Sequence, residues 1–282
     1  MPEKYREYIH GDKAEIPYGE TVIEEYAFLG CKDLTALEIP DSVKTIGRRA
    51  FYCCTGLISV EIPNSVTEIG GNAFAYCTGL TSVEIPNSVK TIGHNAFRGC
   101  TGLTSIEIPN SVTEIGAIAF AGCTGLTSVE IPDSVTTIGK GAFQGYNIER
   151  LVVHSQNPRY SCSGNCVLSK NREILVLGCK ASIIPNSVKT IGGDAFAGCT
   201  GLTSVEIPDS VKTIGGNAFF GCTGLTIIKF HNSKPSESQI LLEALGIEDY
   251  GQISLYTPIG AGYAYRHNDF FKQFKEIIPT LR

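Results

Sequence analysis

No run of about 18 consecutive apolar residues occurs in this sequence, so no segment is predicted to cross a membrane as a helix. The N-terminal segment MPEKYREYIHGDKAEIP also lacks the apolar stretch of a signal peptide. Two locations therefore stay open. The chain is either a cytoplasmic protein, or a secreted or surface protein whose leader has been removed or lies outside the given sequence.

A large excess of basic charge is missing as well. The formal net charge is −5 at pH 7, whereas a protein that binds nucleic acid needs a basic surface. Nucleic acid is therefore not an expected partner. Hydrophobic residues make up 43% of the 282 residues, which is enough for a continuous core.

Recognisable catalytic signatures are missing too. No histidine is paired with a cysteine, or with serine and aspartate, in a nucleophile motif, and no glycine-rich loop between a strand and a helix would cradle a phosphate. The five histidines are scattered along the chain: His10, His94, His154, His231 and His267. We therefore predict that the chain is not an enzyme, needs no cofactor, and has no catalytic, cofactor-binding or metal-binding residues.

What the sequence does contain is a repeat of 23 residues. The segment CTGLTSVEIPNSVKTIGHNAFRG, which begins at Cys77, recurs with small changes along the chain. An Ile-Pro pair marks its phase, with prolines at Pro17, Pro40, Pro63, Pro86, Pro109, Pro132, Pro185 and Pro208. A period between about 20 and 50 residues indicates a stack of coils instead of a compact globule.

One coil of this repeat has a recognisable internal pattern. Leu80, Val83 and Ile85 have the spacing of strand residues that face the interior, and Glu84 faces outward between them. Phe97 is predicted to fill the core from a short helical or 3-10 turn. One coil cannot bury this set alone, so neighbouring coils must stack. We predict an α/β repeat solenoid of 23-residue coils with short strands and short helical turns.

Most of the eleven cysteines follow the repeat instead of a disulfide pattern. Seven of them lie at one position of the coil: Cys31, Cys54, Cys77, Cys100, Cys123, Cys199 and Cys222. We expect a column of buried thiols, because a ladder of metal sites would need further ligands in each coil. Cys162 and Cys166 lie outside this phase, and a local disulfide between them stays open.

One outward position carries a row of glutamates, the first candidate binding surface. It consists of Glu38, Glu61, Glu84, Glu107 and Glu130. Stacked strands lie about 4.8 Å apart, so these carboxylates repel one another. The row is either a solvated by-product of repeat duplication, or an acidic stripe for a cationic partner or a divalent cation. One carboxylate in each coil supplies too few oxygens for calcium.

A second outward position alternates in charge. The residues after each Ser-Val pair are Lys44-Thr45, Thr67-Glu68, Lys90-Thr91 and Thr113-Glu114. We expect neighbouring coils to offset lysine against glutamate here, in weak surface pairs.

The variable positions around Ala-Phe provide a second candidate surface. Its residues are Arg48, Arg49, Tyr52, Tyr76 and Arg98, with His94 beside them. Tyrosine and arginine are favoured in interfaces, so these side chains are predicted to cluster along one edge of the early coils. Ordinary surface variation is the alternative interpretation.

The repeat is interrupted once and closed at both ends. After Phe143 the phase is lost through an insertion, which we interpret as a β-hairpin with strands at residues 166–168 and 174–177, projecting from the stack. The predicted parts are an N-terminal cap (1–15), a first repeat block (16–153), the inserted hairpin (154–179), a second repeat block (180–231) and a C-terminal cap (232–282).

The C-terminal cap is predicted to contain a short helix, a strand and a longer helix. The short helix is expected at residues 238–245, the closing strand at 253–256, and an amphipathic helix near 261–277. The longer helix would bury Tyr265, Phe270 or Phe271, Phe274 and Ile277. Such a cap keeps the end of a repeat stack soluble.

The repeat resembles the BspA-like leucine-rich repeat family, also called the Treponema pallidum type. The motif Ile-Pro-x-Ser-Val-x-x-Ile-Gly-x-x-Ala-Phe occurs seven times, and the insertion NPRYS…VLSKNREILV and the ending LYTPIGAGYAYRHNDFFKQFKEII resemble the hairpin and cap of that family. Family members commonly have tryptophan where this chain has Phe271, and this chain has no tryptophan. The resemblance implies a right-handed leucine-rich-repeat stack.

The resemblance also implies a function. Family members are mostly surface or secreted proteins of gut and oral anaerobic bacteria, and several are thought to bind host matrix proteins or other cells. We therefore expect a monomeric, non-enzymatic adhesion module at the bacterial cell surface, whose partner is a host or neighbouring-cell protein or glycan. The alternative is a structural spacer or self-associating scaffold. The family has no fixed binding residues to carry over.

Overall fold

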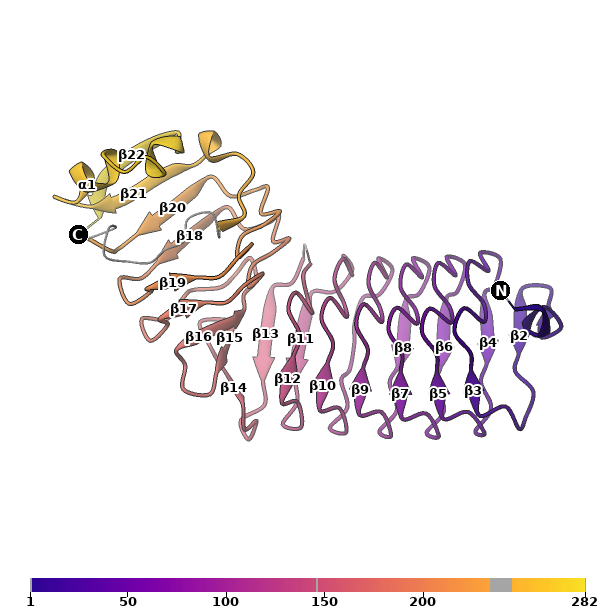
Figure 1. Ribbon diagram of the computed structural model, residues 1–282. Coiled ribbons are helices and arrows are strands. Elements are labelled where there is room, and N and C mark those ends of the chain that lie inside the picture. Colours follow the sequence, from indigo (N-terminus) through magenta and orange to yellow (C-terminus); the bar gives the residue numbers. More distant parts are fainter. Residues whose placement is uncertain (1, 146, 234–244, 282) are drawn as a thin grey trace. The chain divides into compact units, whose positions relative to one another are not determined.

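The computed structural model describes residues 2–145, 147–233 and 245–281. Short strands and turns make up most of this part of the chain, and strands of successive coils lie side by side (Figure 1). Within it, no helix is both long enough and apolar enough to span a membrane.

The chain divides into two compact units. The N-terminal unit consists of Met1–Gly145 and Val153–Arg159, and the C-terminal unit consists of Tyr146–Val152 and Tyr160–Arg282. The division falls where the sequence repeat is interrupted, at strand β13 (Arg150–Val153).

One sheet of the N-terminal unit contains short parallel strands in the order β12-β10-β9-β7-β5-β3. These strands are β3 (Val22–Ile23), β5 (Thr45–Ile46), β7 (Glu68–Ile69), β9 (Thr91–Ile92), β10 (Glu114–Ile115) and β12 (Thr137–Ile138). Paired residues are one repeat apart, as Glu114 with Thr91 and Ile115 with Ile92. The repeat length is therefore the length of one coil, and the predicted stack of coils is confirmed.

A second strand runs through most of these coils. The elements are η1 (Glu3–Arg6), β1 (Ile9–His10), β2 (Lys13–Glu15), β4 (Ala36–Glu38), β6 (Ser59–Glu61), β8 (Ser82–Glu84) and β11 (Ser128–Ile131). The pairs β2–β4 and β6–β8 are parallel, whereas β1 and β2 form an antiparallel pair at the N-terminal end. Successive residues of these strands alternate between exposed and buried, as the sequence pattern predicts.

The segment around each Ala-Phe pair differs from the predicted helical turn. In the described coils it consists of consecutive turns, because its N–H groups alternate between two kinds of acceptor. The N–H of Ala96 donates within the coil to Gly93 (3.1 Å), but that of Phe97 donates to Ala119 of the next coil (2.8 Å). A helix needs every N–H for its own segment, so the bonds between coils exclude one here.

A stack of phenylalanine rings forms the centre of the N-terminal unit. Phe28, Phe51, Phe74, Phe97, Phe120 and Phe143 are all buried. Neighbouring ring centroids are 5.1 to 5.4 Å apart and nearly parallel. At the N-terminal end Tyr5 packs edge-on against Phe28, and its hydroxyl accepts a hydrogen bond from the N–H of Glu24 (2.8 Å). Tyr5 thus closes the stack.

Two sheets lie within the C-terminal unit. The first has the order β14-β15-β16-β17-β19 and the second the order β18-β20-β21-β22. Their strands are β14 (Tyr160–Ser163), β15 (Cys166–Ser169), β16 (Ile174–Leu177), β17 (Thr190–Ile191), β18 (Ser204–Ile207), β19 (Thr213–Ile214), β20 (Ile227–Phe230), β21 (Ser254–Pro258) and β22 (Glu276–Leu281). Within this unit Phe196 and Phe219 stack at 5.1 Å.

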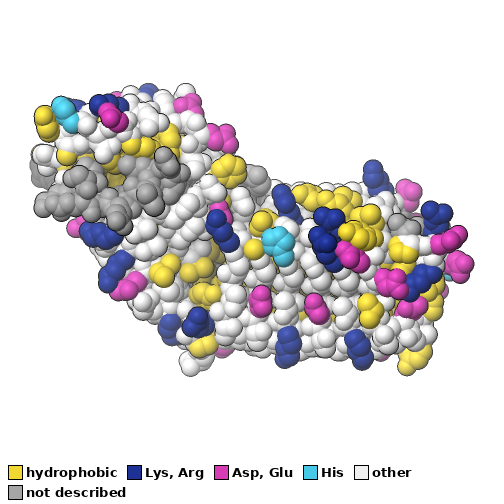
Figure 2. Space-filling model, in the orientation of Figure 1, with side chains coloured by type: hydrophobic (Ala, Val, Ile, Leu, Met, Phe, Trp, Pro, Cys, Tyr) yellow, Lys and Arg dark blue, Asp and Glu magenta, His cyan; other side chains and the backbone are white. Residues whose placement is uncertain are grey.

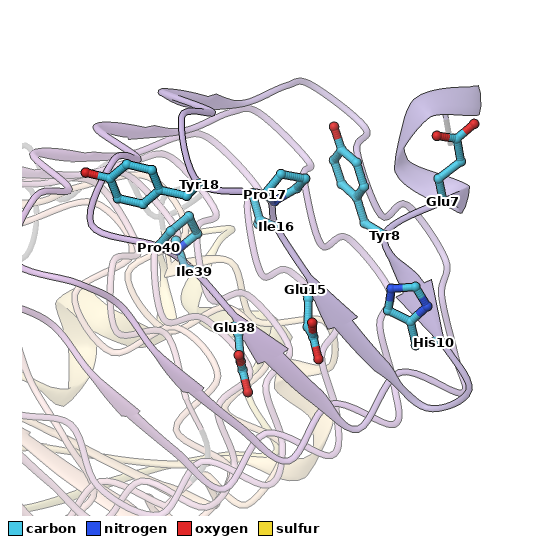
Figure 3. Close-up of a pocket in the computed structure, with 10 residues that line it drawn as sticks. All are labelled: Glu7, Tyr8, His10, Glu15, Ile16, Pro17, Tyr18, Glu38, Ile39 and Pro40. Atoms are coloured by element: carbon cyan, nitrogen blue, oxygen red, sulfur yellow. The ribbon is translucent and has the colours of Figure 1, made fainter.

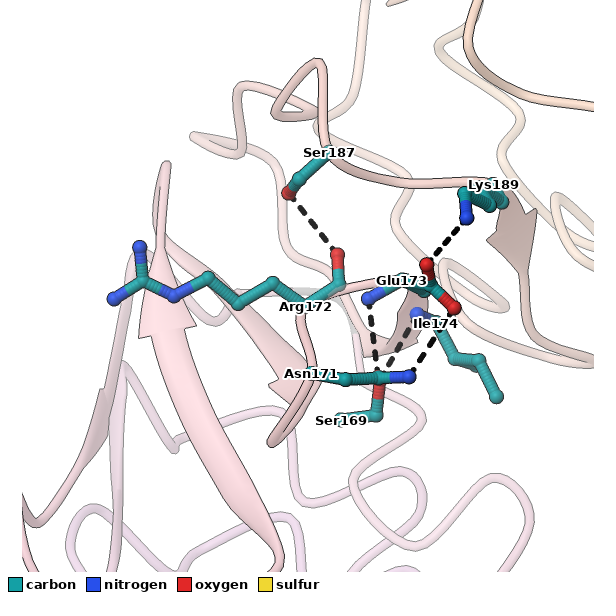
Figure 4. Close-up of polar contacts among 7 residues, drawn as sticks. All are labelled: Ser169, Asn171, Arg172, Glu173, Ile174, Ser187 and Lys189. Carbon is teal, nitrogen blue, oxygen red and sulfur yellow. Dashed lines mark hydrogen bonds and ion pairs between the residues drawn. The ribbon is translucent and has the colours of Figure 1, made fainter.

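The inserted segment joins a sheet instead of projecting from the stack. Strand β15 is antiparallel to β14 and β16, but β16 then pairs in parallel with β17. The turn between β15 and β16 is fixed by polar contacts (Figure 4). Ser187 Oγ donates to the carbonyl of Arg172 (3.0 Å), and Lys189 forms an ion pair with Glu173.

No disulfide joins Cys162 and Cys166 in the structure. In the antiparallel pair β14–β15, Cys162 is opposite Val167, and Cys166 is opposite Ser163. Opposite residues share a face, and neighbours along a strand have opposite faces. The two cysteines therefore lie on different faces of the ribbon, which disfavours the local disulfide.

The C-terminal cap corrects two predictions. In place of one helix at 261–277, the structure has α1 (Gly262–Arg266), η4 (Phe271–Gln273) and β22. The strand that we expected to be the last of the sheet is β21, but β22 pairs with it and is the last strand instead. Asn268 interrupts the helix, because its side chain accepts a hydrogen bond from the N–H of Phe270 (3.0 Å). Another 3-10 helix, η3 (Tyr250–Gln252), precedes β21.

The expected aromatic core of the cap is nevertheless present. Tyr265, Phe271 and Phe274 are buried, and the Tyr265 hydroxyl donates to the carbonyl of Asn232 (2.7 Å). Most of the helix expected at residues 238–245 lies outside the residues that the structure describes.

Candidate interaction surfaces

The predicted glutamate row forms a surface that we call the acidic strand face. It consists of Glu15, Glu38, Glu61, Glu84, Glu107 and Glu130, all in the N-terminal unit and all exposed. Sequence analysis missed Glu15 because it assigned residues 1–15 to a cap. The signal was present, since Glu15 precedes an Ile-Pro pair in the same phase as Glu38.

Carboxylates of this face lie directly opposite one another. Glu15 pairs with Glu38 between β2 and β4, and Glu61 pairs with Glu84 between β6 and β8. Among the described residues, no lysine or arginine forms an ion pair with any of these four. At the far end of the row, His154 Nε2 lies 3.8 Å from Glu130 Oε2. Among the described residues, the first four carboxylates of the row therefore have no basic side chain that compensates their charge.

The other sheet of the same coils avoids such neighbours. There Thr45, Glu68, Thr91, Glu114 and Thr137 follow one another in register, so each glutamate lies between threonines. Two glutamates at strand spacing would repel by about 1 kcal/mol in water. The carboxylates of the acidic strand face therefore repel their neighbours, whereas the glutamates on the other side of the same coils are separated by threonine.

The predicted pairing of lysine with glutamate is not found on this second sheet. The carbonyl of Lys44 accepts from the N–H of Thr67 (2.9 Å), which places Lys44 in a different column from Glu68. In the part of the chain that the structure describes, neither Lys44 nor Lys90 forms an ion pair. The alternation works by separating like charges.

Two hollows lie along the acidic strand face. The first, of about 500 Å³, is lined by Tyr8, His10, Glu15 and Glu38, among others, and the carboxylates of the two glutamates extend side by side from neighbouring strands (Figure 3). The second, of about 660 Å³, includes Glu61, Glu84 and Glu107. No group of three or more histidine, cysteine or acidic residues suited to a metal occurs within the described ranges.

The corresponding position of the C-terminal unit is neutralised. Glu206 is opposite Lys229, whose Nζ lies 3.7 Å from its carboxylate, and His231 Nε2 lies 2.6 Å from the same group. Glutamates of this position without a basic partner among the described residues, such as Glu61 and Glu84, therefore lie in the N-terminal unit.

The predicted aromatic and basic side chains do come together, in what we call the tyrosine–arginine ladder. It consists of Tyr26, Arg49, Tyr52, Tyr76 and Arg98. The Cζ of Arg49 lies 5.9 Å from the ring centroid of Tyr26 and 5.6 Å from that of Tyr52. Tyr52 meets Tyr76 edge-on at 5.5 Å, and the Cζ of Arg98 lies 5.6 Å from the Tyr76 centroid.

This ladder differs in two members from the predicted cluster. Tyr26 was missed, because the first coil is degenerate in sequence. Arg48 instead forms an ion pair with Glu25 (3.3 Å). His94 is exposed, and among the described residues its ring does not contact the ladder. Figure 2 shows basic and hydrophobic side chains next to one another on one face of the N-terminal unit.

Several ladder residues have an unusual backbone conformation. Most coils have two positions with positive φ, and most of these positions hold asparagine, aspartate or glycine. Five side chains in the repeats break this pattern: Tyr26, Arg49, Cys53, Tyr76 and Ile118. Such a residue costs roughly 1 kcal/mol more than glycine, so three members of the ladder are kept at a cost in stability.

The ring of Tyr76 rests on the backbone of the next coil. A Cβ added to Gly99 would lie 2.6 Å from the Tyr76 ring, so only glycine leaves room for it. The ring is therefore held in place by shape as well as by Arg98.

The cysteine column makes specific hydrogen bonds. The thiols of Cys54, Cys77 and Cys100 each donate to the carbonyl of a phenylalanine in the preceding coil, at 3.0 to 3.1 Å. Burial raises the pKa of the Cys123 thiol to about 12 and that of Cys100 well above its ordinary range. These thiols stay protonated, so they are structural and not nucleophilic.

A family model confirms the resemblance. The model described as the BspA type leucine-rich repeat region matches the chain in six copies, over residues 7–106, 90–167 and 178–241. No curated protein matches the chain.

Several solved structures have the same fold. A leucine-rich cell surface protein from Faecalibacterium prausnitzii is 25% identical with a TM-score of 0.63, over 96% of this chain and 88% of its own. A leucine-rich repeat protein from Eubacterium ventriosum is 21% identical with a TM-score of 0.59, over 95% and 78%. The pneumococcal vaccine antigen PcpA is 18% identical with a TM-score of 0.54, over 96% and 80%. At these lower identities the last two show a shared fold only.

Proposed function

The chain belongs to the BspA-type leucine-rich repeat family, and from this premise we propose that it is a non-enzymatic adhesion module that binds a protein partner at the bacterial cell surface. The Faecalibacterium relative is described as a cell surface protein, which supports the location. Repeat stacks offer long, regular surfaces, and such surfaces serve binding.

The contrast between the two sheets of the N-terminal unit carries this proposal. The same coils that separate Glu68 from Glu114 by threonine keep Glu61 opposite Glu84. The alternation of Thr91 with Glu68 and Glu114 shows that these coils can separate their glutamates, so we attribute the unbroken glutamate row of the acidic strand face to use. A partner with lysines or arginines along an extended surface would relieve the repulsion and gain affinity from it.

The test is binding of the purified chain to a panel of extracellular matrix proteins and glycans at low and moderate salt. The informative variant is Glu84→Gln/Glu107→Gln, which removes two charges from the acidic strand face. Its matched control is Glu68→Gln/Glu114→Gln, which removes two charges from the other sheet of the same unit.

Saturable binding to a basic matrix protein that the first variant loses and the control keeps would support the proposal. Equal losses of binding in both variants would show that the total negative charge, and not the acidic strand face, determines binding. If no member of the panel binds, the alternative of a structural spacer or self-associating scaffold is favoured, and light scattering on the same samples then checks self-association.

A further inference from the structure

The two arginines of the tyrosine–arginine ladder have no acidic partner in the part of the chain that the structure describes. Among the described residues neither Arg49 nor Arg98 forms an ion pair, and the Nε of Arg49 is buried without a hydrogen-bond partner. The nearby carboxylate of Glu25 is already paired with Arg48. Two guanidinium groups are thus held over aromatic rings with donors to spare, and such groups bind carboxylates or sulfates in pairs of hydrogen bonds.

The ladder can bind a ligand through its side chains but not through its backbone N–H groups, which are already used in hydrogen bonds. The N–H groups of Tyr26, Arg49 and Tyr76 all donate to carbonyls of the next coil, and those of Tyr52 and Arg98 donate within their own coil. A peptide that binds as an added strand needs free main-chain donors, so the ladder is poorly suited to one. Recognition here must use ring faces and guanidinium groups.

These features fit a polymer of acidic sugars. Coils are about 5 Å apart, so the coils of Arg49 and Arg98, two steps apart, are about 10 Å apart along the stack. One sugar ring is about as long as one coil spacing, so acidic groups on alternate sugars would meet the two arginines. Tyrosine rings between them offer apolar faces for the sugar rings.

We propose that the tyrosine–arginine ladder is a second binding site, which recognises an acidic polysaccharide by pairing its carboxylate or sulfate groups with Arg49 and Arg98 and stacking its sugars on Tyr52 and Tyr76. The site is independent of the acidic strand face. The retention of Arg49 and Tyr76 at positive φ, where neighbouring coils have Asn72 and Gly99, supports it, because strained residues persist where function requires them.

The test measures binding of the full chain to size-defined heparin oligosaccharides and polygalacturonate, with neutral dextran and poly-L-glutamate as comparators. The variant Arg49→Asn/Arg98→Ala restores residues that other coils have at these positions, as Asn72 and Ala75. Its matched control, Lys44→Thr/Lys90→Thr, removes two positive charges from the same coils, again with residues of the repeat. A third variant, Tyr76→Gly, removes a ring and keeps both arginines.

We expect an acidic polysaccharide to bind at physiological ionic strength, and the double arginine variant to weaken it by about tenfold or more. Lys44→Thr/Lys90→Thr should stay within about twofold, because distant charges are screened. Tyr76→Gly should weaken binding too, and Glu84→Gln/Glu107→Gln should not. The unfolding midpoint of the double arginine variant should not fall below that of the wild type, because asparagine tolerates the positive φ of position 49 better than arginine does.

Three results would overturn the proposal. They are equal losses in the lysine and arginine variants, tighter binding of poly-L-glutamate than of either polysaccharide, and no polysaccharide binding by the wild type. Unchanged binding in Tyr76→Gly would show that sugars do not stack on this ring, and the argument for a sugar polymer as the ligand would then fail. Failure of the acidic strand face in its own test leaves all of these outcomes unaffected.

Discussion

Single residues with positive φ control local stability in this protein. Ile118 is a β-branched residue at φ 59°, where Asn72 and Asn95 occupy the equivalent positions of earlier coils. Asparagine tolerates this region far better than isoleucine. We expect Ile118→Asn to raise the free energy of unfolding by about 1 kcal/mol, measured by urea denaturation. The reverse change, Asn72→Ile, should lower it by a similar amount, and a loss of stability in Ile118→Asn would contradict this.

The buried thiols predict a loss of stability at high pH. Burial raises the pKa of Cys100 well above its ordinary value of 9.0. The folded thiol therefore keeps its proton at pH values where the unfolded thiol has lost it. This contribution to the free energy of unfolding is complete below about pH 9 and falls by about 1.4 kcal/mol per pH unit above that.

The variant Cys100→Ala isolates this effect. At neutral pH it should be less stable by about 1–3 kcal/mol, because it leaves the Phe74 carbonyl without its thiol donor. Between about pH 9 and pH 10 the difference from the wild type should shrink by about 1 kcal/mol, because only the wild type has this thiol to titrate. A constant difference over that range would show that the Cys100 thiol is not the group involved.

At the scale of elements, the phenylalanine stack supplies most of the largest fully buried side chains of the N-terminal unit. Phe97 is fully buried between Phe74 and Phe120, at ring distances of 5.4 and 5.3 Å. We expect Phe97→Ala to lower the free energy of unfolding by about 3–5 kcal/mol, measured by denaturant unfolding. Phe97→Leu keeps most of the volume and should cost less than half as much. A midpoint unchanged in Phe97→Ala would contradict this assignment of the core.

The sequence predicted the elements that the repeat itself determines. The inward positions of Val83 and Phe97, the buried cysteine column and the outward Glu84 all follow from one coil and its period, because every coil has the same neighbours. Elements outside the period were less predictable. The segment around Phe271 has a helical apolar pattern, but β21 offers an unpaired edge, and residues after Lys275 pair with that edge as β22.

The candidate surfaces show the same limit. Arg49 and Tyr76 could be found from the sequence because they differ from the equivalent residues of other coils. Their contact through Tyr52, and the part played by Tyr26, depend on the stacking of coils that are one repeat apart. The hydrogen bonds from the thiols to phenylalanine carbonyls could not be predicted either. Every residue has a backbone carbonyl, so the sequence does not show which one accepts from a thiol.

At the scale of the whole molecule, charge of opposite sign is sorted into separate columns of the same coils. Six glutamates of the N-terminal unit lie on the acidic strand face, whereas Arg49 and Arg98 lie in the tyrosine–arginine ladder. With a formal net charge of only −5, the repulsion within the glutamate row is local, and salt should act on it more than on the rest of the chain.

This repulsion predicts a salt-dependent gain in stability. Replacing Glu84 with glutamine removes the middle charge of a row in which Glu61 is directly opposite. At low salt, Glu84→Gln should raise the free energy of unfolding by about 1 kcal/mol, and at about 1 M salt the gain should disappear, because screening already removes the repulsion. The matched variant Glu68→Gln should show no gain at either salt concentration, because threonines lie on both sides of Glu68. Equal gains in the two variants would mean that general negative charge, and not the order of the glutamate row, sets the cost that a basic partner would relieve.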